Sequence, residues 1–140
     1  MMPQHANILG KVFGGTILSL IDKAAAAAAI RHAGRIAVTA TFDQVAFHAP
    51  IEIGELVRIV ASVHAVGRSS MEVGVEVHAT NIATGVTRHT NTCFVTMVAI
   101  DEAGRPTAVP PLRAETDEER ALEAAARERM AARKQARRRP

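Results

Sequence analysis

The stretch NILGKVFGGTILSLID, residues 7–22, combines two features that could support attack on a carbonyl group. Gly14 and Gly15 stand directly before an apolar run with the composition of a helix, and Asp22 lies inside that run. Unpaired N–H groups at a helix N-terminus, aided by the helix dipole, stabilise negative charge on a carbonyl oxygen. A carboxylate can act as a general base for water or as a nucleophile. Glycines leave the backbone open to a carbonyl that approaches it.

The spacing of these groups has a geometric consequence. Asp22 follows Gly15 by seven residues, which is about 10 Å along a helix axis. One carbonyl carbon cannot lie about 3 Å from a donor and a base that are so far apart, so if both act, they come from different subunits. A two-fold dimer with antiparallel helices would bring them together twice. The alternative is an acid paired with Lys23, Arg31 or Arg35, because buried acids are rare unless paired.

Hydrophobic periodicity predicts the elements that would position these groups. Residues 14 to about 33 are dominated by Ala, Leu and Ile, and Gly34 offers a stop, which predicts a helix. Its alanine run, residues 24–29, would let a sheet approach closely. The period then changes to two, which predicts strands with one buried face. These strands span residues 36–47, 56–66, 70–80 and 87–100, and the apolar set of the first is Ile36, Val38, Ala40 and Phe42.

Short connections between the last three strands predict antiparallel neighbours. The expected fold is therefore α+β, with one antiparallel sheet wrapping a long central helix. A Pro-containing break at residues 101–111 ends this core, and we expect one domain over residues 1–112 and a charged tail over 113–140. Acidic residues lead and basic residues trail in the tail, which suits a helix dipole. We expect a helix that lies lightly on the body or protrudes from it.

Composition excludes several classes of function. The core has eight basic and eight acidic residues and few aromatic ones, so the net charge of +3 lies in the tail and nucleic-acid binding is disfavoured. No apolar run is long enough to span a membrane, and no signal peptide is visible. The single Cys93 excludes an internal disulfide and fits the cytoplasm. The six histidines show no pair at zinc-ligand spacing, so we expect no metal.

Several motifs together resemble a known family. They are HANILGKVFGGTILSLID, FHAPIEIGE, VGRSSMEVGVEV and GRPTAVPPL, followed by a charged tail. In this order they are similar to the hotdog-fold acyl-CoA thioesterases, closest to the bacterial and brain-type acyl-CoA hydrolases. The resemblance implies a hotdog fold, a dimer with a continuous sheet, and often a trimer of dimers. It implies hydrolysis of an acyl-CoA substrate with no further cofactor. Hotdog domains usually begin with a strand before the glycine motif, and here only MMPQHA precedes Asn7.

The resemblance also implies roles for individual residues. Asn7 would join Asp22 and the Gly15 N–H in the catalytic set, orienting water or the thioester carbonyl; its plain alternative is a loop or capping residue. Gly14 and the hairpin tip Arg68, Ser69 and Ser70 would contact coenzyme A, since a guanidinium and two hydroxyls suit phosphate oxygens. An ordinary polar turn is the alternative for the tip. Thr39 and Phe47 could line an acyl or pantetheine tunnel or be routine strand residues.

Two other functions are compatible with the same fold. A hydratase or dehydratase of acyl thioesters usually needs an Asp/His pair, for which His32 and His48 are the available histidines. A non-catalytic acyl-CoA sensor would bind the thioester without turnover. Release of free thiol from acyl-CoA would separate the hydrolase from both.

Overall fold

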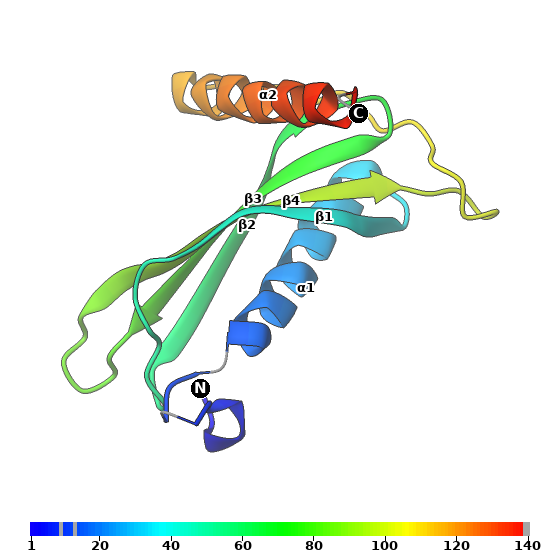
Figure 1. The fold of residues 1–140 in the computed structure, drawn as a ribbon. Helices are drawn as coiled ribbons and strands as arrows, with labels where there is room; N and C mark the ends of the chain where they lie inside the picture. Colours follow the sequence, from blue (N-terminus) through cyan, green and yellow to red (C-terminus); the bar gives the residue numbers. More distant parts are fainter. Residues whose placement is uncertain (9, 13, 139–140) are drawn as a thin grey trace.

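The computed structural model describes residues 1–8, 10–12 and 14–138 and consists of one antiparallel sheet with a helix on each face (Figure 1). Helix α1 spans Gly14–Ala33, and helix α2 spans Asp117–Arg138. The strands are β1 (Ala37–Phe47), β2 (Leu56–Val66), β3 (Ser70–Thr80) and β4 (Thr87–Ala99), in the spatial order β1-β4-β3-β2. The predicted α+β hotdog architecture is confirmed, with strand bounds within one residue of those expected.

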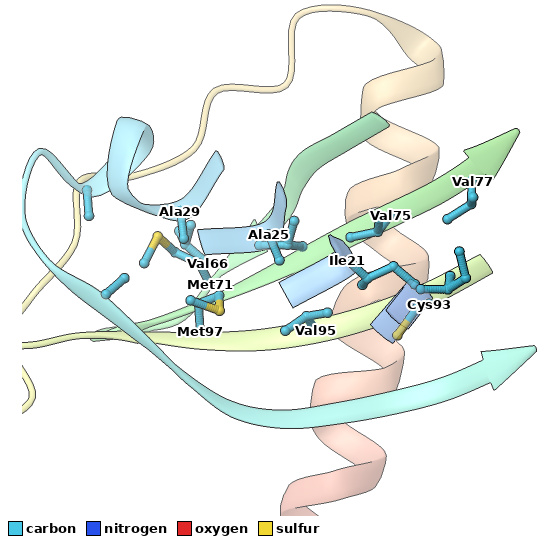
Figure 2. Packing of buried hydrophobic residues seen from close by; sticks show 14 of the residues in the cluster. Ile21, Ala25, Ala29, Val66, Met71, Val75, Val77, Cys93, Val95 and Met97 are labelled. Atoms are coloured by element: carbon cyan, nitrogen blue, oxygen red, sulfur yellow. The ribbon is translucent and has the colours of Figure 1, made fainter. Parts of the chain in front are cut away.

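Helix α1 buries one narrow stripe against the inner face of the sheet. Ile17, Ile21, Ala25, Ala29 and Ala33 recur every four residues and are buried, as expected for one face of a helix. Figure 2 shows Ala25 and Ala29 directly over the core strands, so the small side chains do allow the close approach that the alanine run predicted. The helix ends where the sequence indicates, at a glycine with φ +70°.

Strand β1 departs from the predicted alternation. Ile36 and Val38, expected in the core, are 64% and 44% exposed. The register of β1 against β4 shifts between Thr39 and Thr41 and again between Asp43 and Ala46, and such β-bulges change which face the following residues occupy. Residues four positions apart lie on the same face of a regular strand. Here the shift at Thr39–Thr41 reverses this, so that Thr39 faces α1 while Asp43 faces α2.

The described residues before α1 add no strand to the sheet. Pro3–His5 forms a short 3₁₀ turn, and isolated bridges join Ala6 to Val12 and Lys11 to Glu52. Consequently β1 and β2 are both edge strands. No helix in the described ranges carries an apolar stretch of the length that a bilayer requires.

Helix α2 docks on the outer face of the sheet through ion pairs. Its first turn is capped by the Thr116 hydroxyl, which accepts a hydrogen bond from the Glu119 N–H at 3.0 Å. Glu72 of β3 is 1% exposed and accepts hydrogen bonds from Arg129 at 3.0 Å and Arg133 at 2.5 Å. The expectation of a helix in the tail is confirmed, but the expectation that it lies lightly on the body or protrudes is wrong, because ion pairs to the buried Glu72 anchor it to the sheet. Whether residues 1–112 form a domain without it stays a prediction.

One glycine makes room beneath α2. A Cβ atom at Gly74 would lie 2.0 Å from the His64 ring, so only glycine leaves space for that imidazole on the sheet. The ring meets the edge of Phe94, with 6.3 Å between centroids. The Arg129 guanidinium lies over the Phe94 ring, with its Cζ atom 3.6 Å from the ring centroid. Burial and the nearby Arg129 lower the pKa of His64.

Candidate active site

Asp22 lies in the middle of α1 on the side that faces β1. The Thr39 hydroxyl donates a hydrogen bond of 2.5 Å to its Oδ1 atom. Within the described ranges, no Lys or Arg forms an ion pair with Asp22, so the pairing with Lys23, Arg31 or Arg35 is not observed. Asp22 is thus a half-buried acid whose observed side-chain partner is a hydroxyl.

Thr39 contacts Asp22 in a way that the sequence did not predict. It was expected at most to line a tunnel, but its hydroxyl fixes the position of Asp22. Its Oγ1 atom also lies 3.4 Å from the Met97 sulfur. The sequence offers one indication of this contact, a threonine in a strand that follows a helix with a lone acid. That the threonine faces the acid becomes clear only from the register of β1.

Gly14 and Gly15 are the first two residues of α1. Their N–H groups belong to the set of four that has no acceptor within a helix. A Cβ at Gly14 would lie 3.8 Å from the Phe47 ring, which is ordinary contact, so β1 closes one side of this helix end. Phe13, which precedes them, lies outside the described residues. In one chain the glycines are separated from Asp22 by two helical turns.

Asn7 stabilises the loop that precedes α1. Its Oδ1 atom accepts a hydrogen bond from the Lys11 N–H at 3.1 Å. Its backbone N–H donates to the Lys11 carbonyl at 2.6 Å, and its carbonyl accepts from the Gly10 N–H at 3.0 Å. The structure thus gives Asn7 the loop role that the sequence kept as its plain alternative. Its catalytic role stays a prediction.

The hairpin tip with Arg68, Ser69 and Ser70 lies at the far end of the sheet. The Arg68 and Ser69 carbonyls accept hydrogen bonds from the Val109 and Ala99 N–H groups at 2.8 and 2.9 Å. The tip is therefore beside the start of β1, whereas Gly14 is beside its last residue, roughly 30 Å away along an eleven-residue strand. One chain does not bring the tip to the glycines.

The edge strand next to Asp22 presents an apolar surface. Val38, Phe42, Val45 and Phe47 of β1 are between 36% and 54% exposed. Beside them run the unpaired backbone groups of an edge strand, which readily pair with another chain. An open groove of about 590 Å³ lies on the opposite side of α1, against β2, and is not lined by Asp22.

The histidines do not supply a partner for Asp22. His32 contacts the Pro110 carbonyl at 2.9 Å near the end of α1. His48 lies against His89, and His89 against His78, with ring centroids 5.1 and 5.2 Å apart. Among the residues that the structure describes, no cluster of His, Cys, Asp and Glu has the geometry of a metal site. The Asp/His pair that a hydratase needs is therefore not assembled in this part of the chain.

Cys93 is buried in β4 and faces the core. Burial raises the pKa of its thiol to about 11. The thiol is therefore protonated at neutral pH, and a structural role fits it better than a nucleophilic one.

Comparison with known proteins identifies the family. Residues 9–86 match the thioesterase superfamily. The chain belongs to that superfamily. Among its relatives, the uncharacterized acyl-CoA thioester hydrolase YkhA of Bacillus subtilis is 40% identical over 119 residues, which cover 85% of this chain and 69% of YkhA.

Solved structures of thioesterases share the whole fold. The crystal structure of an apo-hexameric acyl-CoA thioesterase is 40% identical, with a TM-score of 0.94, over 99% of this chain and 88% of that one. The acyl-CoA hydrolase of Staphylococcus aureus, in complex with butyryl coenzyme A, is 36% identical, with a TM-score of 0.90, over 98% and 84%. Alanine variants of an asparagine, an aspartate and a threonine of the S. aureus protein have also been solved.

Proposed function

We propose that this thioesterase hydrolyses acyl-CoA to free coenzyme A and a carboxylic acid in a site shared by two subunits. The observation that carries the proposal is the position of Asp22: it is held by the Thr39 hydroxyl, lies beside an exposed apolar edge strand, and is two helical turns from the helix N-terminus. The names of the relatives supply the substrate class.

The reaction needs a base or nucleophile and a donor for the developing oxyanion. In the simplest form, Asp22 takes a proton from water and the oxygen attacks the thioester carbonyl carbon. The carbonyl oxygen becomes negative and is stabilised by the Gly15 N–H of the second subunit. The C–S bond then breaks, the thiolate of coenzyme A takes up the proton, and the acid is released. In direct attack, an Asp22 oxygen would bond to the carbonyl carbon and coenzyme A would leave as the thiolate. Water would then hydrolyse the resulting anhydride, releasing the acid and supplying the proton that the thiolate takes up.

A two-fold dimer resolves the separation between the two groups. The N–H of Gly15 and the carboxylate of Asp22 lie about 10 Å apart along one helix, too far for one carbonyl. Antiparallel α1 helices would place Gly15 of each chain near Asp22 of the other. The free edge of β1 and its exposed apolar side chains offer the surface for such pairing.

The S. aureus variants support the choice of residues. In that protein the altered asparagine, aspartate and threonine are spaced 15 and 17 residues apart. Asn7, Asp22 and Thr39 have the same spacings in this chain. We therefore assign Asn7 to the site as the residue that orients water or the thioester carbonyl, and Thr39 as the residue that holds Asp22.

Coenzyme A would be held by groups from more than one subunit. Gly14 leaves the backbone open beside the thioester, while Arg68, Ser69 and Ser70 offer a cation and hydroxyls for its phosphates. Because the tip is at the far end of the sheet, these phosphate contacts require a neighbouring chain. An assembly as a trimer of dimers would supply it, and the hexameric relatives fit this arrangement. We place the enzyme in the cytoplasm, where the free thiol of Cys93 would remain reduced.

Complementation between two inactive variants tests the shared site. Asp22→Asn removes the acid, and Gly15→Pro removes the N–H group in the first helical turn, where proline is tolerated. A mixed dimer has one site with both groups intact and one with both lost, so random co-assembly should restore about a quarter of wild-type thiol release. Each variant alone is the control. Mixtures as inactive as their parents would rule out the shared site, and a wild type that binds acyl-CoA without releasing thiol would show a sensor instead.

A further inference from the structure

A buried carboxylate lies at the end of the molecule where α1 begins. Glu55, in the turn before β2, is 5% exposed. Its two oxygens accept hydrogen bonds from the two terminal nitrogens of Arg88, at 2.5 and 2.7 Å. The same guanidinium donates to the Pro50 carbonyl at 2.6 Å. Arg88 belongs to β4, so this pair fastens the turn at residues 50–55 to the sheet.

The turn at residues 50–55 in turn contacts the segment that precedes α1. The Ile51 carbonyl accepts a hydrogen bond from the Val12 N–H at 3.0 Å. The backbones of Lys11 and Glu52 form a bridge, and their side chains form an ion pair. Lys11 then donates its N–H to the Asn7 carboxamide. An unbroken series of contacts therefore runs from Arg88 through the turn to Asn7.

We propose that Glu55 and Arg88 are positioning residues for the reaction, which set the location of Asn7 and of the first N–H groups of α1. The inference rests on the proposed function, because it concerns the same site. Lys11 and Val12 are fixed to the turn at residues 50–55, Asn7 is bound to Lys11, and the forked ion pair fixes that turn to the sheet. Side chains that hold reacting groups to within fractions of an ångström raise the rate through orientation.

The electrostatics of the pair suit a permanent anchor. The Arg88 guanidinium holds the pKa of the Glu55 carboxyl below its ordinary value, against the opposing effect of burial. Glu55 in return raises the pKa of Arg88. Both groups therefore stay charged across the neutral range, and the anchor persists there. Arg88→Lys keeps the charge but cannot reach both Glu55 oxygens and the Pro50 carbonyl, because an ammonium lacks the planar fork.

Steady-state kinetics of Glu55→Gln, Arg88→Lys and the double variant Glu55→Gln/Arg88→Gln test the inference. We expect kcat for acyl-CoA to fall by about 10-fold or more with KM changed by less than about 2-fold, because misplacement weakens transition-state contacts selectively. If the pair acts as a unit, the double variant loses no more than Glu55→Gln alone. Arg129→Gln is the matched control, since it breaks a buried ion pair on the opposite face of the sheet. An equal fall in kcat in this control, at the same loss of thermal stability, would overturn the inference.

Hydrogen exchange separates this inference from the proposed function. We expect the amides of residues 6–15 to exchange faster in Glu55→Gln than in the wild type, and at wild-type rates in Arg129→Gln. Unchanged exchange in Glu55→Gln, or a normal kcat in a folded variant, would overturn the positioning role. If the wild type itself released no thiol, the proposed function would fail, while the exchange result would still decide whether the pair sets the loop. Arg88→Lys serves the same measurement if Glu55→Gln does not fold.

Discussion

One acid lies between the sheet and a helix on each side of the molecule, Glu72 under α2 and Asp22 on α1, and the two have contrasting partners. On the outer face, Glu72 is fully buried and bound by Arg129 and Arg133 of α2. On the inner face, Asp22 is carried by the helix itself and is held by the hydroxyl of Thr39. Two guanidinium groups bind the first acid, whereas among the described residues no Lys or Arg forms an ion pair with the second.

This difference separates structural charge from chemical charge. A buried ion pair ties elements together, and removing one partner leaves the other exposed to a low-dielectric interior. A partly buried acid that has no ion-pair partner lowers the stability of the fold. Such acids are found preferentially at functional sites. Altering each acid in turn should therefore affect different properties of the protein.

The largest expected effect follows from Asp22→Asn. Loss of the carboxylate should lower kcat for acyl-CoA by roughly 10² to 10⁴-fold, the usual contribution of a general base. The thermal midpoint should stay near that of the wild type, because the amide oxygen can still accept the Thr39 hydroxyl. Thiol release and a thermal melt measure the two quantities. Turnover within a few-fold of the wild type would place the chemistry on another residue.

The converse effect follows from Glu72→Gln. Removal of this charge should lower the free energy of unfolding by roughly 1 to 3 kcal/mol, because two arginines lose a charged acceptor. The kcat value should remain close to that of the wild type, since α2 lies on the face of the sheet opposite Asp22. Denaturant unfolding with parallel kinetics checks both. A large loss of kcat without loss of stability would show that the outer face takes part in the reaction.

A smaller effect sharpens the comparison through pH. The pKa of His64 is lowered by its burial and by Arg129 of α2, with Glu72 and Glu76 of β3 acting in the opposite direction. The unfolded chain therefore binds this proton more readily, so stability is complete above the ordinary histidine pKa of about 6.5 and falls as the pH drops toward the lower folded value. Thermal midpoints of the wild type between pH 7 and 5 should fall more steeply than those of His64→Gln. Parallel slopes would show that the ring is uncoupled from α2.

The regular parts of the fold were accessible from the sequence. The helix of residues 14–33 follows from its Ala, Leu and Ile composition and the Gly34 stop, and the strands β2 to β4 follow from their period of two and the short connections between them. Strand β1 could not be assigned in the same way. Its bulges interrupt the period of two, and its exposed Val38 and Phe42 lie on a sheet edge where the described residues supply no further strand.

The candidate site was accessible in composition but not in arrangement. Asp22 and the glycines stand out because an acid and helix-breaking residues are unusual in an apolar run. Thr39 did not stand out, because a threonine in a strand is ordinary until its register places it against the acid. Likewise the docking of α2 depends on Glu72. Its place among the polar positions of β3 predicted exposure to solvent, whereas the structure buries it.

The extra residue in β1 at Ala40 separates two demands on one strand. In a regular strand of the same length, Thr39 and Asp43 would lie on the same face, so Asp43 would turn away from Arg133 or Thr39 would leave the acid it holds. Deleting Ala40 would remove the bulge and one residue together and keep both contacts on their present sides, whereas a deletion between Thr41 and Asp43 that left the bulge in place would put both residues on one face. In sequence comparisons across the superfamily, a one-residue gap in this strand therefore carries more meaning than a substitution, and its position shows whether the tail helix and the reacting helix can both stay attached.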